Sequence, residues 1–316
     1  MDADVDRRFV ISMRRTGLGD CLWSLASAWS YARNTGRTLV VDWRGSCYLR
    51  DPAQNLFELL FENDADIGGV PLFIQRGNEP HKVEGSVFPP WWGEPLEGRL
   101  ERSDQLIFSE RDMLRELFLS RRPIDAGTIV CDACLMWACR EEDEREFYEN
   151  MRIRRKIKES ILEFCRSKFL GHNVIGVHIR HGNGEKMHDH EPYWGDLSAT
   201  VERVVDEVRR LRRQSSFRNS RIFLSTDNIG VLQIFAREFP SLLTFKKKYR
   251  DPGDGALHTA SNGFEGAVAA LIDMNILSYC NALVRYPPTS AFSRLASIVV
   301  PTVVEYRIET GKFTES

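Results

Sequence analysis

The segment that most constrains the fold is a short apolar run, residues 173–179, which ends in a cluster of polar residues and glycines. Its β-branched side chains are typical of a strand buried on both faces of an α/β sheet. Residues Arg180 to Gly184 would then lie at the carboxyl end of that strand, where open α/β sheets bind ligands. Arginine grips phosphate oxygens with a planar fork, and glycine lets backbone approach a ligand closely. The segment predicts a phosphate site, with a surface arginine that caps a loop as the alternative.

Strand-like and helix-like segments alternate in the first part of the chain. We expect strands at 8–13 and 37–42, a glycine turn at 16–20 and a helix over 21–33. The turn stands where dinucleotide-binding folds place phosphates. Residues 44–127 are less regular.

The second part repeats this alternation from about residue 151. Helices are expected at 152–168, 229–238 and 265–280, with one more capped by Asp196 or Ser198, and strands at 173–179, 222–226, 242–245 and 282–286. The order of elements predicts an α/β chain. It would form two Rossmann-like domains, residues 1–150 and 151–316, facing each other across a cleft.

Composition narrows the class of protein. The net charge of −2 over 316 residues gives no field that would draw the chain to nucleic acid or a membrane. Arginines near 203–213 alternate with acidic residues, as on a solvated helix face. The chain has no run of 18 apolar residues, and residues 1–8 are polar, the reverse of a secretory leader. We expect a cytoplasmic protein with no membrane span and no nucleic-acid partner.

Seven cysteines are scattered along the chain, an odd number that is typical of free thiols in a reducing compartment. Cys131 and Cys134 form a C-x-x-C pair near Cys139, but no second pair and no histidine stands close in sequence. We expect buried structural thiols, with metal or redox chemistry as the alternative.

Pro89, Pro90, Trp91 and Trp92 form a stiff aromatic cluster in a predicted loop. Together with Trp194, these rings could stack on a sugar or fill a hydrophobic core. Both interpretations stay open at this point.

Three strand ends in the second half converge on one edge of the predicted sheet. They carry His178, Arg180, His181 and Asn183, then Thr226, Asp227 and Asn228, and finally Thr289 and Ser290. Thr289 or Ser290 would cap a helix that carries Phe292 and Arg294, and the N–H groups at its start favour an anion. An arginine from one loop and a helix N-terminus from another suit a diphosphate.

Asp273 stands near the middle of an otherwise apolar helix. A carboxylate in such surroundings must find hydrogen-bond donors. The N1–H and exocyclic amine of guanine would supply them, as would an arginine or a capping role. Taken alone, the residue favours the structural interpretation.

Several of these motifs stand together in a characteristic order. They are T-G-L-G-D-C-L-W-S-L-A at 16–26, V-H-I-R-H-G-N-G at 177–184, F-L-S-T-D at 223–227, the helix of Asp273, and P-P-T-S-A-F-S-R at 287–294. In this order the chain resembles the α1,6-fucosyltransferases of the rhizobial nodulation-protein-Z family, and more distantly the core fucosyltransferases of N-glycans. The resemblance spans nearly the whole chain.

The resemblance implies a GT-B glycosyltransferase whose C-terminal domain binds GDP-fucose. The N-terminal domain would lie on the acceptor side, with its glycine loop closing over the donor. The reaction would be an inverting transfer of fucose to the 6-hydroxyl of the reducing-end N-acetylglucosamine. The acceptor would be a chitooligosaccharide or lipo-chitooligosaccharide Nod factor. It also implies that the transfer needs no metal and no cofactor.

The resemblance also assigns residues. Arg180 matches the arginine that holds the β-phosphate, His178 and Asp273 the pair that reads guanine, and Ser290 a serine that contacts phosphate. Gly17 and Gly19 match the glycine loop of the N-terminal domain. His181, Asn183, Asp227 and Thr289 complete the expected donor site. His181 stands where the N-glycan enzymes have a second arginine, so a second permanent charge is not assured there.

The general base is the least determined residue. The loop 185–191 holds Glu185, His188, Asp189, His190 and Glu191, and any of these could accept the proton of the acceptor hydroxyl. Asp189 fits the family position best and is our predicted base. The D-x-D sequence Asp64-Ala65-Asp66 lies away from the predicted strand ends, so Arg180 is expected to replace a metal.

Other classes of protein remain as rivals. A P-loop GTPase needs G-x-x-x-x-G-K-[ST], which is absent, and a dehydrogenase would show a fuller G-x-G-x-x-G. A regulatory protein that binds GDP or another nucleotide without catalysis is the remaining alternative to the enzyme.

Overall fold

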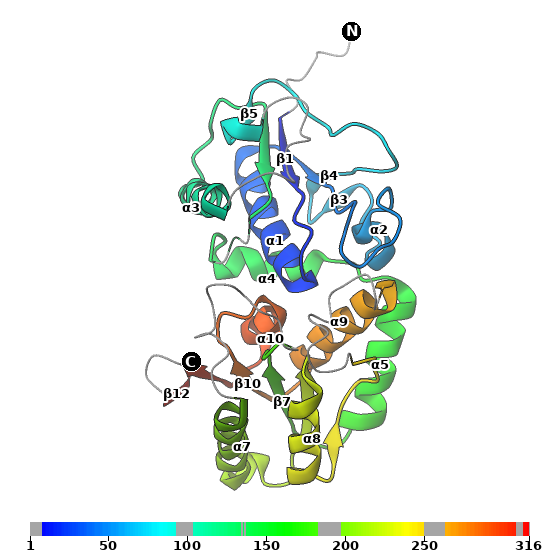
Figure 1. The fold of residues 1–316 in the computed structure, drawn as a ribbon, viewed down its shortest axis with the longest axis vertical. Coiled ribbons are helices and arrows are strands. Elements are labelled where there is room, and N and C mark those ends of the chain that lie inside the picture. The colour runs from blue at the N-terminus through cyan, green and yellow to red at the C-terminus, as the bar shows by residue number, and fades with distance from the viewer. Residues whose placement is uncertain are drawn as a thin grey trace. The chain divides into compact units, whose positions relative to one another are not determined.

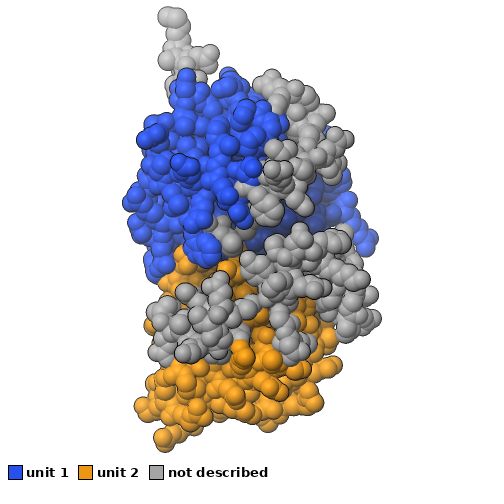
Figure 2. Space-filling model, turned by 60° about the vertical axis from the view of Figure 1, so that its left-hand side comes forward, with its two compact units in different colours: residues 1–154 blue, residues 155–316 orange. Residues whose placement is uncertain are grey.

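The computed structural model describes residues 8–92, 104–133, 135, 137–182, 197–249, 263–307 and 312–315. The chain divides into two compact units, residues 1–154 and 155–316, which Figure 2 colours separately. In the described residues, each unit has a six-stranded, mostly parallel sheet with helices packed against it (Figure 1). No described helix is both long and apolar enough to cross a membrane.

The sheet of the first unit has the strand order β3-β4-β2-β1-β6-β5. All its pairings are parallel except the one between β3 and β4. The strands are β1 (Phe9–Ser12), β2 (Thr38–Val41), β3 (Asp66–Ile67), β4 (Val70–Ile74), β5 (Val87–Phe88) and β6 (Thr128–Cys131). The helices are α1 (Leu18–Thr35), α2 (Leu56–Leu60), the 3-10 turn η1 (Pro90–Trp92), α3 (Asp104–Ser120) and α4 (Glu141–Asn150).

Helix α1 is the central element of the first unit. It contacts β1, β2, α3 and α4, so it is buried on nearly every side. Trp23 and Trp29 are 1 % and 0 % exposed, and the indole N–H of Trp29 donates to the carbonyl of Ile67 at 2.7 Å. The helix ends at Gly36, whose φ of 66° is the left-handed cap that glycine adopts without strain.

The sheet of the second unit has the strand order β12-β11-β10-β7-β8-β9. Only the β11–β12 pairing is antiparallel. The strands are β7 (Val174–Ile179), β8 (Arg221–Thr226), β9 (Leu242–Leu243), β10 (Ala282–Tyr286), β11 (Val303–Arg307) and β12 (Lys312–Glu315). The helices are α5 (Arg155–Phe169), α7 (Leu197–Arg213), the 3-10 turn η3 (Ser215–Phe217), α8 (Ile229–Glu238), α9 (Gly263–Ser278), the 3-10 turn η4 (Ala291–Ser293) and α10 (Arg294–Val299).

The central strand β7 presents a different residue pattern to each face of this sheet. Val177 and Ile179 pack into the apolar cluster that also holds the valines of α7. The opposite face meets α9, because a Cβ added to Gly176 would lie 2.8 Å from the sulfur of Cys280 and 3.2 Å from Leu277. Glycine at 176 therefore lets α9 approach the strand closely, and His178 follows two residues later on that same face.

Most expected strands and helices are confirmed to within a few residues. The expected glycine turn is the exception in the first unit, because α1 already begins at Leu18. Gly17 is its N-cap residue and Gly19 lies inside its first turn. The prediction of a turn over 16–20 was therefore wrong in its second half, and the glycine spacing marks a helix start.

Candidate functional site

Arg180 follows β7 directly and is anchored at the carboxyl edge of the sheet. Its backbone N–H donates to the carbonyl of Tyr286 at 2.8 Å, and its guanidinium pairs with the carboxylate of Asp227. The same carboxylate accepts the backbone N–H groups of His181 and Gly182, each at 3.1 Å. Asp227 therefore uses both oxygens to fix the start of this loop and to aim the arginine.

Asp227 was expected to contact a ligand alongside Arg180. Its contacts among the described residues are with the segment that follows β7, and the neighbouring Asn228 donates to the carbonyl of Gly182 in that segment at 2.8 Å. Asn228 also caps α8, accepting from the N–H groups of Gly230 and Val231. These contacts are those of residues that position the arginine and its loop.

A row of polar side chains crosses the three central strands on the face toward α9. Arg285 of β10 stands in register with His178 of β7, which stands in register with Ser225 of β8. His178 is 3 % exposed, and its ring stacks on Phe292 with centroids 5.0 Å apart. Burial lowers the pKa of His178, assisted by the nearby charge of Arg285, so the imidazole is neutral. Its Nδ1 has no hydrogen-bond partner among the described residues.

Asp273 projects from α9 onto the same row. Its Oδ2 accepts from the hydroxyl of Ser225 at 2.9 Å and from the ammonium of Lys247 at 2.6 Å. Its Oδ1 is buried and has no partner among the described residues. Although burial opposes the charge, the carboxylate of Asp273 raises the pKa of Lys247 above its usual value. The hydrogen-bond donors expected for Asp273 in its apolar helix are thus Ser225 and Lys247. One carboxylate oxygen has no partner among the described residues.

The loop after β10 leads into a helix that begins after Ser290, as expected, but this helix is a 3-10 turn. Ser290 precedes the 3-10 turn η4, makes no side-chain capping hydrogen bond, and α10 begins only at Arg294. The guanidinium of the buried Arg285 donates to the carbonyl of Pro288 and to that of Ser290, the latter at 3.3 Å. The predicted N-cap position of Ser290 is therefore confirmed, but the helix that it begins is a short 3-10 turn, and its side chain makes no capping hydrogen bond.

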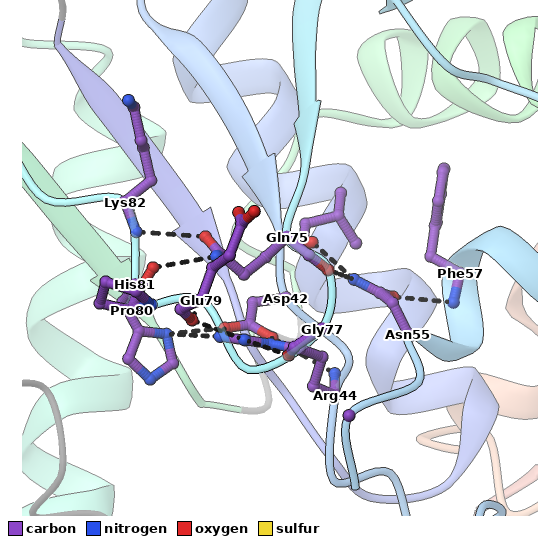
Figure 3. Close-up of polar contacts among 12 residues, drawn as sticks. Asp42, Arg44, Asn55, Phe57, Gln75, Gly77, Glu79, Pro80, His81 and Lys82 are labelled. Carbon is purple, nitrogen blue, oxygen red and sulfur yellow. Dashed lines mark hydrogen bonds and ion pairs between the residues drawn. The ribbon is translucent and has the colours of Figure 1, made fainter. Parts of the chain in front are cut away.

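The first unit also gathers polar residues where its strands end, and Figure 3 shows one such group. Arg44 pairs with Asp42 through two contacts of 2.8 Å and donates to the carbonyls of Gly77 and Glu79. His81 Nδ1 lies 2.7 Å from Oδ2 of the same carboxylate, an oxygen that also accepts from Arg44. Although burial alone would raise the pKa of Asp42, hydrogen bonds from Arg44 and His81 hold it well below its usual value. The cluster joins the loops after β2 and β4.

The sequence did not predict this cluster, because His81 stands 37 residues after Arg44 in the chain and only the fold brings it to Asp42. Asn55 and Gln75 extend it through hydrogen bonds to backbone, as Figure 3 shows. At the start of α1, near the expected glycine loop, the N–H of Leu18 donates to the hydroxyl of Tyr48 at 3.2 Å.

The aromatic cluster at 89–92 is chiefly a hydrophobic plug. Trp92 is 3 % exposed and packs in the core with Phe9 and Val130. The indole N–H groups of Trp91 and Trp92 both donate to Glu110 at 3.1 Å, which fixes them against α3.

The described cysteines are all free thiols, as expected. Burial raises the pKa of Cys131 to about 12 and of Cys165 to about 11, so these thiols stay protonated. Within the described ranges, no group of three or more His, Cys, Asp or Glu side chains could hold a metal ion. Asn183, the predicted base Asp189 with its loop 185–191, Trp194 and Cys134 lie outside the described residues.

The sequence and the fold both match known proteins. The family model described as Nodulation protein Z (NodZ) matches residues 6–314. The chain belongs to the nodulation protein Z family. A nodulation protein Z from Azorhizobium caulinodans is 50 % identical to it over 309 residues, covering 98 % of this chain and 94 % of that protein.

Solved NodZ structures share the fold. The fucosyltransferase NodZ from Bradyrhizobium superposes with a TM-score of 0.83 at 43 % identity, covering 98 % of both chains. A NodZ α1,6-fucosyltransferase soaked with GDP-fucose gives the same TM-score at 42 % identity, over 98 % of this chain and 99 % of that one. The predicted fold class, a GT-B-like α/β fold with two Rossmann-like units, is confirmed. So is the enzyme class: the chain is a glycosyltransferase of the NodZ α1,6-fucosyltransferase kind.

Proposed function

We propose that the chain transfers L-fucose from GDP-fucose to the 6-hydroxyl of the reducing-end N-acetylglucosamine of a chitooligosaccharide or lipo-chitooligosaccharide. The transfer inverts the anomeric centre and needs no metal. Family membership supports the reaction class, and the related NodZ soaked with GDP-fucose supports the donor.

The observation that carries the donor site is a pair of buried polar atoms that have no hydrogen-bond partner among the described residues. Asp273 Oδ1 and the Nδ1 of His178 both lie where the strands of the second unit end. A buried polar group left unpaired costs about 1–3 kcal/mol, so a ligand that pairs with it recovers that free energy. Guanine offers N–H donors to the carboxylate of Asp273, and its ring nitrogens offer hydrogen-bond partners to the imidazole of His178. This supports the pair as the base-reading part of the site.

Arg180 is proposed to hold the β-phosphate. Its guanidinium keeps its charge at any physiological pH and presents a fork that matches two phosphate oxygens. Asp227 positions it, while His181, Asn183, Thr289 and Ser290 are proposed to line the diphosphate. Gly17 and Gly19 are proposed as the contact from the N-terminal unit.

The chemistry needs a stabilised leaving group and a proton acceptor. As the C1–O bond of fucose breaks, its electron pair passes to the β-phosphate, and Arg180 stabilises the growing charge. The acceptor O6 forms the new bond on the opposite face of C1 and gives its proton to a base. We propose Asp189 as that base, in line with the family position.

Transfer of labelled fucose from GDP-fucose to chitotetraose tests the proposal. We expect a fucosylated product whose label is released by an α1,6-specific fucosidase. Tight GDP binding without any transfer would instead indicate a nucleotide-binding regulator.

A further inference from the structure

Lys247 is a buried cation that the mechanism above does not use. Its side chain is 12 % exposed, and its ammonium lies 2.6 Å from Asp273, whose side chain is 1 % exposed. It comes from the segment after β9, while Asp273 comes from α9, so folding brings two distant parts of the second unit together. Taking an ammonium and a carboxylate out of water costs several kcal/mol per ion. Such a pair is informative because an apolar pair would fill the same space at less cost.

In this ion pair, the hydrogen-bonding groups of Asp273 are not all satisfied by described residues. Both protein donors, Ser225 and Lys247, approach the single oxygen Oδ2 of Asp273. The other oxygen, Oδ1, has no partner among the described residues, and neither has Nδ1 of His178, which stands in register with Ser225. One oxygen of the Asp273 carboxylate is therefore left to accept further hydrogen bonds, next to the charged ammonium of Lys247.

This pattern of acceptor beside donor matches one edge of one nucleobase. Guanine places an N1–H and a 2-amino group next to a 6-oxo acceptor, whereas adenine places an amino donor at position 6. An ammonium has three N–H donors, and the carboxylate takes one of them in this structure. A 6-oxo group would accept another, while a 6-amino group would face the ammonium donor to donor.

We propose that Lys247 is a specificity-determining residue of the donor site, whose ammonium donates to the 6-oxo group of guanine while Asp273 accepts from N1–H and the 2-amino group. The inference rests on the proposed function, since it needs the base of GDP-fucose in this pocket. The two residues divide the selection: Lys247 selects 6-oxo purines, and Asp273 selects the 2-amino group among them.

Calorimetric titration of the full chain with base-modified nucleotides tests this division. The probes are GDP, 6-thio-GDP, which changes only the acceptor at position 6, and IDP, which lacks only the 2-amino group. The variant is Lys247→Met, which keeps an unbranched apolar side chain and removes the ammonium. Lys248→Met is the matched control, because Lys248 pairs at 3.2 Å with Glu265 and both side chains are about 80 % exposed.

We expect the wild type and Lys248→Met to prefer GDP over 6-thio-GDP by about tenfold, since sulfur is a weak acceptor. Lys247→Met should bind GDP about tenfold or more weakly and bind the two nucleotides within about twofold of each other. Its preference for GDP over IDP should persist, because Asp273 still reads the 2-amino group. A merely structural lysine would weaken all three nucleotides alike and leave every ratio unchanged, which overturns the inference.

Lys247→Met leaves Asp273 as a buried charge with less compensation, so thermal melting must accompany the titration. If that variant does not fold, the double variant Lys247→Met with Asp273→Asn removes both charges and answers the same question. Retention of the wild-type ratio of GDP to 6-thio-GDP in the double variant overturns the role of Lys247. ADP is a fourth probe, and a wild type that binds GDP, IDP and ADP equally would instead refute the guanine site of the proposed function.

Discussion

Replacing Arg180 by alanine separates its role in turnover from any role in folding. Preorganised groups aimed at a developing charge supply about 2.7–4 kcal/mol, and each 1.36 kcal/mol is tenfold in rate. We therefore expect Arg180→Ala to lower turnover by about 100-fold or more. Fold disruption is not expected, because the side chain of Arg180 is 22 % exposed and Asp227 keeps two backbone N–H donors, from His181 and Gly182.

The assay is the initial rate of fucose transfer at saturating GDP-fucose, with thermal melting of each variant. Arg180→Lys should recover only part of the loss, since a point charge does not replace a two-pronged fork. Arg221→Ala is a suitable control, because Arg221 begins β8 at the opposite end of the strand from Asp227 and its guanidinium donates to the carbonyl of Lys168. If Arg180→Ala keeps more than about a tenth of normal turnover, the residue is not the electrophilic group of the donor site.

Three further outcomes follow from the same account. Activity should persist in excess EDTA, and a loss of more than about tenfold that Mg²⁺ or Mn²⁺ restores would contradict a metal-free transfer. Asp189→Asn should lower turnover by about 100-fold while GDP affinity stays intact, and retention of a tenth of normal turnover would remove Asp189 as the base. Asp42→Asn should cost about 3 kcal/mol of unfolding free energy at neutral pH, because it leaves Arg44 and His81 without their carboxylate. The pKa of Asp42 is lower in the folded protein than in the unfolded chain. The wild type is therefore more stable than the variant by the full amount above about pH 4, the ordinary pKa range of an aspartate, and by less as the pH falls further. Urea denaturation at pH 7 and pH 3 measures it, and an equal difference at both values would contradict the assigned cause.

Much of the second unit could be predicted because its strands are buried on both faces. The apolar run at 173–179 corresponds to β7 (Val174–Ile179), and the expected strand at 282–286 matches β10. Apolar runs of this kind predict buried strands from the local sequence alone. The polar residues that follow them indicate the edge of the sheet where ligands bind. The convergence of His178, Arg180 and Asp273 on one unit could thus be anticipated.

The missed features depend on contacts between distant segments. Helix α3 (Asp104–Ser120) lies in a region that we expected to be less regular. Its buried Glu110 accepts hydrogen bonds from the indoles of Trp91 and Trp92 and from the backbone N–H of Asp132, all of them outside the helix. The sequence does not distinguish Lys247 from its exposed neighbour Lys248. Only the fold brings Lys247 to Asp273. Arg285 offered a local signal, since a charged residue inside the apolar strand β10 requires acceptors. Its acceptors proved to be carbonyls of the loop that follows the strand.

The placement of the nucleotide in the second unit is the central claim, and a crystal structure of this chain with GDP bound tests it most directly. The account predicts guanine N–H groups within hydrogen-bond distance of Asp273 Oδ1, and a β-phosphate oxygen on the guanidinium of Arg180. A guanine bound away from Asp273 and His178, or a diphosphate that does not touch Arg180, would contradict it.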